Sequence, residues 1–319
     1  MPLFRTILGI ACLSVLMGCA SVPDGAILAE EPASGAQEKT LRIAVIGDRT
    51  GGHRPGVFSN AMGKLELMDP DIVLSVGDQI EGYVADETEI RRQWDEVEQI
   101  LEPFGDRFHA VPGNHDYAND VQARIWRERR GPPFWSFVQD GVLFVGLSTE
   151  DPPVKLPDYA IEGHRRLQEA MRRDPSATQQ RILDASRART DNPKPGEVAI
   201  SDEQVNFVRQ TLEKYPDSRW TFLIMHKPAW NYNNANFARI EQLLAGRSFT
   251  AIAGHEHYYG YDRRGERDFL TLSTTGGVWL KDGPGRVDHI LWVTLRDGKP
   301  GFANIRIDGI FPKSGPIAD

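Results

Sequence analysis

The sequence predicts an α/β protein in which short apolar strands alternate with amphipathic helices. Five segments have the same form, an apolar run that ends in aspartate, asparagine or histidine: residues 41–48, 71–78, 107–116, 220–226 and 249–257. All-apolar runs are typical of strands that are buried on both faces, and helices between them indicate crossover connections. We therefore expect a largely parallel sheet whose polar strand ends converge on one place.

Helices are predicted between these strands because apolar residues recur there every three or four positions. The clearest examples lie within residues 57–65, 90–101, 205–212 and 237–244. Asp86 with Glu89, and Ser201 with Gln204, have the spacing of helix-capping pairs. The helices should therefore begin just after Asp86 and Ser201.

Two other parts of the chain predict antiparallel pairing. Residues 135–138 and 142–147 should form a hairpin, because Gln139-Asp140-Gly141 between them is a turn sequence. The last apolar runs predict a β meander, with a turn at Asp297-Gly298. Its strands are residues 269–273, 289–295 and 302–307.

Residues 152–198 lack strand signals and contain two helical stretches, at about residues 160–173 and 177–188. We interpret this segment as a helical insertion on the α/β scaffold. It is either a solvated appendage or a lid over the site.

The N-terminus predicts an export signal over residues 1–18. Arg5 precedes an apolar run at residues 7–17, which is too short to span a membrane. Leu16-Met17-Gly18-Cys19 resembles the end of a bacterial lipoprotein signal, which implies cleavage before Cys19 and a lipid on that cysteine. An ordinary signal peptide that is cut nearby is the alternative.

The same resemblance implies an outer-membrane location facing the periplasm, because Ala20 rather than aspartate follows Cys19. Residues 19–40 then comprise the lipidated cysteine and a flexible tether, since they are rich in Ala, Glu, Gly, Pro and Ser without periodicity. The folded domain is expected over residues 41–319. The lipid on Cys19 is thus the predicted contact with the membrane.

Composition limits the partners and the sources of stability. The formal net charge is −8, which argues against a nucleic-acid partner. The chain has two cysteines, and Cys12 would leave with the signal. The exported protein would then have no disulfide and would depend on its hydrophobic core.

The polar strand ends combine carboxylates, one amide and imidazoles. This mixture of ligands suits zinc, manganese or iron better than calcium. A single Gly-Asp or histidine at a strand end is usually a turn, a cap or a packed side chain. That explanation does not suit six such residues at five predicted strand ends: Asp48, Asp78, Asn114, His226, His255 and His257.

These residues belong to an ordered series of motifs. The series is Gly47-Asp48, Gly77-Asp78, Gly113-Asn114-His115-Asp116, His226 and Gly254-His255-Glu256-His257. It resembles the motif series of the calcineurin-like metallophosphoesterases, which include the purple acid phosphatases. The resemblance implies a four-layer α/β/β/α sandwich with two metal ions at the strand ends, and a phosphate-ester substrate.

The resemblance also implies a role for each residue. Asp78 would bridge the two metal ions, and Asp48 and His257 would bind one of them. His115 would stand beside the leaving group, with Asp116 orienting it. The other metal ion would be bound by Asn114, His226 and His255.

The implied chemistry explains why these residue types are needed. Two cations about 3.5 to 4 Å apart stabilise an in-line displacement at phosphorus, and a metal ion lowers the pKa of its bound water to about 7. Hydroxide on the metal would then attack a phosphate monoester or diester. Histidine supplies a proton to the leaving oxygen, which is worth a factor of about 10² to 10⁴.

The chain departs from the family at one position. The usual first motif is Asp-x-His, but Thr50 stands where that histidine would be. Purple acid phosphatases also lack it and use a tyrosine three residues after the bridging aspartate, where this chain has Glu81. We expect Glu81 to bind the metal ion that Asp48 binds, with His53 and Tyr83 as the other candidates.

Some further residues remain to be assigned. Arg49 is a candidate for binding substrate phosphate, or else a solvated arginine. Asn233 is a candidate for lining the cleft, or else part of a polar turn beside a helix cap. We interpret His109, His164 and His289 as structural.

The sequence therefore predicts an exported, lipid-anchored phosphoesterase with two metal ions, which are iron, manganese or zinc. The altered first motif leaves a second hypothesis, a lipoprotein that binds metal or phosphoryl groups without turnover. A third hypothesis is an extracytoplasmic nuclease, against which the acidic composition argues.

Overall fold

The computed structural model describes residues 40–153, 155–187 and 197–309. The predicted signal peptide, the predicted lipidation site Cys19 and most of the predicted tether lie outside the described residues. Among the described helices, none is long and apolar enough to cross a membrane.

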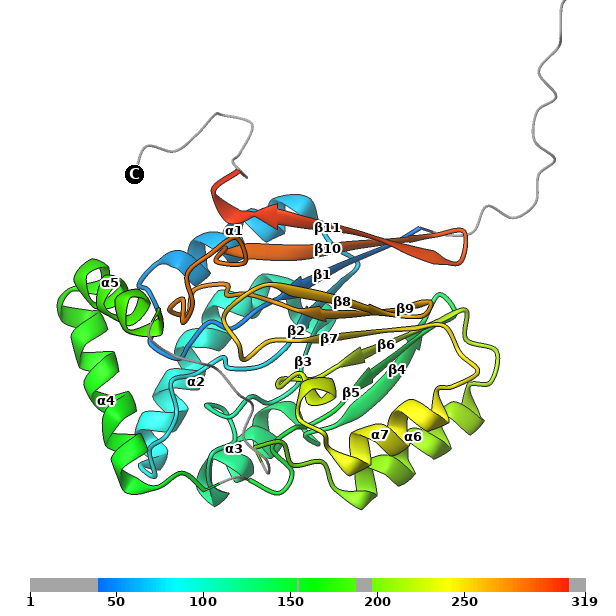
Figure 1. Cartoon of the computed structure of the whole chain (residues 1–319), viewed down its shortest axis with the longest axis horizontal. Coiled ribbons are helices and arrows are strands. Elements are labelled where there is room, and N and C mark those ends of the chain that lie inside the picture. The colour runs from blue at the N-terminus through cyan, green and yellow to red at the C-terminus, as the bar shows by residue number, and fades with distance from the viewer. Residues whose placement is uncertain (1–39, 154, 188–196, 310–319) are drawn as a thin grey trace, which may run out of the picture. The chain divides into compact units, whose positions relative to one another are not determined.

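Two mixed sheets form the centre of the described structure (Figure 1). The first has the strand order β11-β10-β1-β2-β3, in which β1, β2 and β3 are parallel and the last two strands of the chain form an antiparallel hairpin. Its strands are β1 (Leu41–Ile46), β2 (Ile72–Ser75), β3 (Phe108–Ala110), β10 (His289–Arg296) and β11 (Lys299–Arg306).

The second sheet has the order β4-β5-β6-β7-β9-β8. Its four central strands are parallel, and the strands at its two edges are antiparallel to their neighbours. These strands are β4 (Trp135–Gln139), β5 (Val142–Gly146), β6 (Trp220–Ile224), β7 (Phe249–Ala253), β8 (Gly260–Arg264) and β9 (Arg267–Thr271). The predicted parallel pairing is thus confirmed, divided between two sheets, and the β4–β5 hairpin has the predicted turn.

Helices cover the outer faces of both sheets. Those against the first sheet are α1 (Val57–Met68), α2 (Glu87–Leu101) and α3 (Asp120–Arg130). Those against the second are α6 (Asp202–Lys214) and α7 (Ala235–Leu243). Short 3₁₀ helices occur at Glu102–Arg107, Ala229–Asn231 and Ile307–Gly309.

Three hydrophobic clusters separate these layers. The first lies between the helices α1 to α3 and the first sheet, and it includes Trp94, Trp126 and Ala44. The second lies between the two sheets and includes Val45 and Phe222. The third lies between the second sheet and α6 and α7. Three interfaces between four layers make the α/β/β/α sandwich that the sequence predicted.

The predicted caps are present. The Asp86 carboxylate accepts hydrogen bonds from the N–H groups of Thr88 and Glu89, and Ser201 accepts one from Gln204. Asn234 caps α7 through the N–H of Phe237. Each satisfies donors that the first turn of a helix leaves unpaired.

Two sequence predictions differ from the structure. The predicted β meander is wrong, because its first strand (β9) belongs to the second sheet and the other two (β10, β11) belong to the first. Between β9 and β10 the chain crosses from one sheet to the other, and Thr274 makes isolated bridges to Asp48 and to Asp288. Helix α3 was not predicted, because its many charged side chains obscure the apolar periodicity of the sequence. Its Ile125 and Trp126 are buried.

Two further helices, α4 (Asp158–Arg173) and α5 (Pro175–Ser186), lie between β5 and α6. Both were predicted within the 152–198 insertion. Figure 1 shows them beyond the side of the sandwich at which β1, β6 and β7 end. This is the side that carries the polar strand ends.

Candidate metal centre

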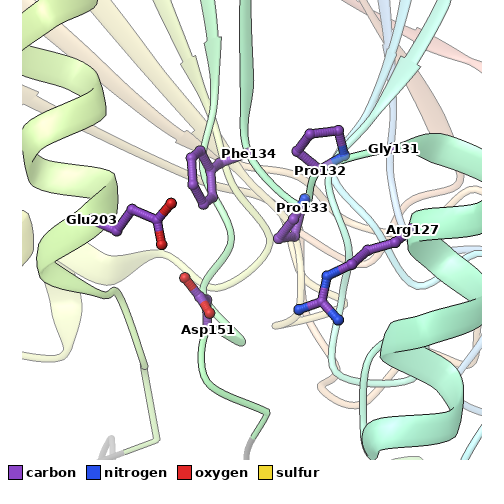
Figure 2. A pocket seen from close by; sticks show the side chains of 7 residues that line it. All are labelled: Arg127, Gly131, Pro132, Pro133, Phe134, Asp151 and Glu203. Carbon is purple, nitrogen blue, oxygen red and sulfur yellow. The ribbon is translucent and has the colours of Figure 1, made fainter.

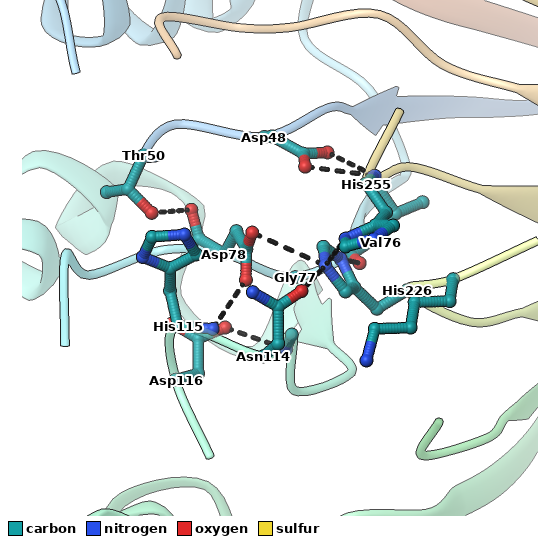
Figure 3. A network of polar contacts seen from close by, with 12 residues as sticks. Asp48, Thr50, Val76, Gly77, Asp78, Asn114, His115, Asp116, His226 and His255 are labelled. Carbon is teal, nitrogen blue, oxygen red and sulfur yellow. Dashed lines mark hydrogen bonds and ion pairs between the residues drawn. The ribbon is translucent and has the colours of Figure 1, made fainter. Parts of the chain in front are cut away.

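The candidate metal centre lies where strands of both sheets end. Asp48 follows β1, Asp78 follows β2 and Asn114 follows β3, whereas His226 and His255 follow β6 and β7. Because the two sheets pack face to face, their parallel strands end at a common edge. Figure 3 shows these side chains directed toward one another.

Two groups of potential metal ligands share one residue. Asp78, His226 and His255 form the first group, and Asp48, Asp78 and His257 form the second. Within each group, the ligand atoms all lie within 4.8 Å of one another. Asp78 is therefore the carboxylate that the two groups have in common.

The first group surrounds the Nε2 atom of His226. This nitrogen lies 3.3 Å from Asp78 Oδ2, 3.2 Å from His255 Nδ1 and 2.8 Å from Asn114 Oδ1. Asn114 Nδ2 donates a hydrogen bond to the Tyr83 hydroxyl, so Oδ1 is the amide atom that faces the group. Asn114 Oδ1 thus adds a fourth potential metal ligand to the three residues of the first group. Below, "donors" means these potential metal ligands.

Backbone carbonyls orient two of the imidazoles. His226 Nδ1 donates to the carbonyl of Val76 at 2.9 Å, and His257 Nδ1 donates to the carbonyl of Val278. Nε2 is then the free nitrogen in both rings, and His257 Nε2 lies 3.2 Å from Asp48 Oδ2. A hydrogen bond of this kind selects the tautomer that can bind a metal ion.

Unusual backbone conformations bring the donors together. Asp78, His255 and His257 have φ values of 56°, 72° and 49°, in the left-handed region that side chains other than glycine rarely adopt. Gly113 is required for space as well, because a Cβ on it would lie 2.1 Å from Asp78 Oδ1. Such strain is concentrated at functional sites.

Asp78 and His226 are buried, and their charges interact strongly. Burial alone raises the pKa of Asp78, but the neighbouring His226 and His115 outweigh it and hold that pKa well below its usual range. Burial lowers the pKa of His226, and the Asp78 carboxylate more than offsets this and raises it to about 9. Without a cation, a proton on His226 therefore compensates the Asp78 charge.

His115 lies beside the donors and is held by a different residue from the one expected. Its Nδ1 donates to the Glu81 carbonyl at 2.7 Å, which leaves Nε2 for a ligand. The Asp116 carboxylate instead accepts hydrogen bonds from the N–H groups of Gln79, Ile80 and Gly113. Asp116 therefore shapes the backbone around the site, and the Glu81 carbonyl orients the His115 ring.

Residues 41–259, more than half of the 319-residue chain, match the model of the calcineurin-like phosphoesterases. The chain belongs to the calcineurin-like phosphoesterase family. Comparison with curated protein sequences gives no match.

Two solved structures of phosphatases share the fold. A dimetal phosphatase from Danio rerio is 14% identical with a TM-score of 0.58, and the match covers 84% of this chain and 96% of that one. The purple acid phosphatase PPD1 from yellow lupin (Lupinus luteus) is 13% identical, also with a TM-score of 0.58. The match covers 86% of this chain and 53% of the lupin protein.

The donor set of this phosphoesterase fits divalent or trivalent metal ions. Asp48 and Asp78 are almost fully buried, and buried carboxylates that lie close together require nearby positive charge. Oxygen and imidazole donors in one cluster suit zinc, manganese or iron. The six predicted ligands at the strand ends are all brought together.

Glu81, which was predicted to replace the missing histidine, belongs to neither donor group. Its carboxylate accepts hydrogen bonds from the N–H groups of Gly52 at 3.1 Å and His53 at 2.6 Å, and it contacts the His53 ring at 3.1 Å. The Thr50 hydroxyl donates to the carbonyls of Asp78 and Ile80. Glu81 and Thr50 thus fix the loop that follows β1, and His53 supports Glu81.

The two predicted substrate-binding residues lie away from the donors. The Arg49 guanidinium is buried and binds the Gln79 carbonyl at 2.8 Å and the Glu96 carboxylate on α2. Asn233 is exposed in the turn before α7, with a φ of 50°. Neither lines the cavity at the metal centre, so the alternative interpretation of Asn233 as part of a polar turn suits the structure better.

A cavity of about 280 Å³ opens onto the metal centre. One side is formed by the donors and His115, and the other by side chains from α4 and the residues before it. Gln179 on α5 holds this insertion in place, because its side chain exchanges hydrogen bonds of 2.8 and 2.9 Å with the backbone of Trp279. The described part of the insertion therefore forms one side of the cavity at the site.

His164 is a site residue that the sequence interpretation missed. Its ring stacks on Tyr83, with centroids 4.5 Å apart, and meets the His115 ring edge-on at 5.0 Å. Burial and the charge of His115 lower the pKa of His164 to about 4, so it is neutral at pH 7. The signal for this position was the helical spacing of Ala160, His164 and Leu167.

A separate cavity of about 400 Å³ lies beside the end of α3 (Figure 2). Asp151 and Glu203 face it, together with Arg127 and the Phe134 ring. Asp151 already accepts hydrogen bonds from Ser201 and Gln204. This cavity contains none of the predicted site residues.

Proposed function

We propose that this protein hydrolyses phosphate esters at a site that holds two metal ions of iron, manganese or zinc. The observation that carries the proposal is the position of Asp78, which belongs to both groups of donors. The family supports phosphoester hydrolysis as the reaction class. When bound, two ions would supply an activated water molecule and neutralise charge on the phosphoryl group.

The side chains around the ions would have separate roles in the reaction. Asp48, Asp78, Asn114 and the three histidines would hold the ions that neutralise the phosphoryl group, and this group would lie close to His115. His115 Nε2 would give a proton to the leaving oxygen, while Nδ1 remains bound to the Glu81 carbonyl. Tyr83 and His164 would hold the His115 ring from the side of the insertion.

The test uses the full-length protein, stripped of metal with a chelator and then reloaded with one metal at a time. Release of p-nitrophenol from its phosphate monoester and its diester measures activity, and elemental analysis measures bound metal. We expect activity to return with metal and Asp78→Asn to lose both metal and activity. Asp262→Asn, at an exposed position on β8, is the matched control and should keep both.

Three outcomes would contradict the proposal. Activity that survives the chelator would show that the reaction does not require a metal ion. Two bound metal ions without turnover of any ester would favour the hypothesis of a binding lipoprotein. Cleavage of single-stranded DNA but not of small esters would favour a nuclease.

We also propose that the protein is exported and anchored by a lipid on Cys19, facing the periplasm from the outer membrane. The Leu16-Met17-Gly18-Cys19 motif supports this proposal. Labelled palmitate should enter the wild-type protein and not the Cys19→Ser variant, and only the wild type should fractionate with membranes. A wild-type protein without label would refute the anchor.

A further inference from the structure

The cavity at the metal centre has one polar wall and one apolar wall. The polar wall carries the metal donors and His115. The facing wall comes from the insertion and from the loop after β9. Its side chains are Leu156, Ala160, His164, Leu167 and Leu280.

The sequence of α4 directs this wall toward the site. Ala160, His164 and Leu167 are spaced four and three residues apart, so they share one face of the helix. Arg165 and Arg166 on the other face are exposed, and Arg165 pairs with acidic residues of its own helix. Leu167 also packs over the loop after β1, because a Cβ on Gly52 would lie 3.2 Å from it.

Among the described residues that line the cavity, no positively charged side chain is available to bind a second anionic group of a substrate. Lys227 is buried, and its ammonium binds both oxygens of Glu150 at 2.8 and 3.0 Å and the Glu197 carbonyl at 2.8 Å. These contacts use the three N–H donors of a lysine. The Glu197 carboxylate, 3.5 Å from His255 Nε2, adds negative charge to the same side of the cavity.

The apolar surface extends past the insertion. Tyr83 and Leu156 also line an adjoining cavity of about 480 Å³, together with the apolar Val84, Val121 and Ile161 and the polar Asn119, Asp120 and Lys155. Apolar side chains therefore continue along one side of the metal centre. Removing such surface from water favours a ligand group that is itself apolar.

We propose that the insertion forms a binding site for the leaving group, and that the substrate is a phosphate ester of an uncharged, apolar alcohol, aromatic or branched aliphatic. The inference rests on the proposed phosphoesterase activity, and it adds the substrate class. The phosphoryl group sits against the donors, and the apolar group packs against Ala160, Leu167 and Leu280. Among the described residues that line this cavity, Lys227 is already paired, so a second anionic group on the ester should bring no gain in affinity.

Phosphonates test this without turnover, since their carbon–phosphorus bond is not an ester. Calorimetry on the full-length, metal-loaded protein compares methylphosphonate, benzylphosphonate and phosphonoacetate. Burial of the ring should make benzylphosphonate bind roughly tenfold or more tightly than methylphosphonate. Phosphonoacetate, which carries a carboxylate, should gain nothing over methylphosphonate.

Two variants of the apolar wall and one control variant show where the benzyl ring binds. Ala160→Trp narrows the cavity and should weaken the binding of benzylphosphonate far more than that of methylphosphonate, which removes the advantage of the ring. Arg166→Trp adds the same side chain to the exposed face and should keep the advantage. Leu280→Ser changes a side chain that is 42% exposed, so it tests the same wall without disturbing the core. It should reduce the advantage several-fold.

Any of three results would overturn the inference: equal affinity for methylphosphonate and benzylphosphonate, tighter binding of phosphonoacetate, or equal loss of both ligands in Ala160→Trp. Absence of binding by all three phosphonates would overturn it as well.

Turnover of benzyl phosphate and glucose 6-phosphate, both esters of primary alcohols, separates the proposed substrate class from the proposed phosphoesterase activity. Hydrolysis of both at equal kcat/KM would overturn the inference alone, whereas ring-selective binding without hydrolysis would overturn the proposed function alone.

Discussion

The Tyr83 hydroxyl accepts a hydrogen bond of 2.5 Å from Asn114 Nδ2. This bond sets the direction of the amide, because it leaves Oδ1 facing His226 Nε2 at 2.8 Å. Burial raises the pKa of Tyr83 well above its ordinary value, and the Asp78 carboxylate adds to this. The Tyr83 hydroxyl is therefore placed to orient Asn114, a candidate metal ligand.

Tyr83→Phe should weaken the binding of one metal ion by about 10- to 100-fold, the usual effect of losing a group that orients a ligand. The ring remains in place against His164, so the fold should be unaffected. Metal titration followed by calorimetry measures the change. Tyr261→Phe, at an exposed position, is the control, and equal affinity in Tyr83→Phe and wild type would contradict the role.

Glu81→Gln should keep two metal ions per chain and lower the free energy of unfolding by about 1 to 3 kcal/mol, because two backbone N–H groups exchange a charged carboxylate for an amide with one neutral acceptor oxygen. Those groups belong to Gly52 and His53. Chemical denaturation and elemental analysis give the two quantities. His53→Ala should cost less, since the Glu81 carboxylate keeps its backbone partners. Loss of one metal ion in Glu81→Gln would restore Glu81 as a metal ligand.

His115→Ala should reduce turnover of alkyl phosphates by about 10² to 10⁴, because an alkoxide needs a proton when it leaves. p-Nitrophenyl phosphate should lose far less, since p-nitrophenoxide is a weak base. Steady-state kcat for both esters, with metal content measured in parallel, provides the test. An equal fall for both substrates would show that His115 is not the acid.

His289 should make the protein less stable in mild acid. Its Nε2 accepts from the Ser273 N–H and its Nδ1 donates to Asn304, so the fold requires the neutral ring. Burial lowers its pKa from 6.5 to about 4. Its contribution to stability is thus complete above pH 6.5 and is lost as the pH falls to about 4, because the unfolded chain binds the proton first.

The loss should approach about 3 kcal/mol, from 1.36 kcal/mol per unit of pKa. Urea denaturation of wild type and His289→Gln between pH 4 and pH 7 measures it. The variant should be less stable at pH 7 and should show a smaller dependence on pH. The same slope in both proteins would assign the acid sensitivity to other groups.

The sequence by itself determined the order of the strand ends and the chemistry that they carry. Asp48, Asp78, Asn114 and the histidines follow apolar strands directly, so their positions depend on local patterns and on the rule that parallel strands end at one edge. The helix caps at Asp86 and Ser201 are equally local. These features could be predicted because each depends on a few neighbouring residues.

Only the tertiary structure decided the contacts between distant segments. The Glu81 carboxylate binds the loop after β1 rather than joining the donors, and the Glu81 carbonyl rather than Asp116 orients His115. The division of the last strands between two sheets, and the placement of His164 over the site, also depend on packing. Such contacts join residues far apart in the chain, and their geometry depends on how whole layers pack, which no local pattern encodes.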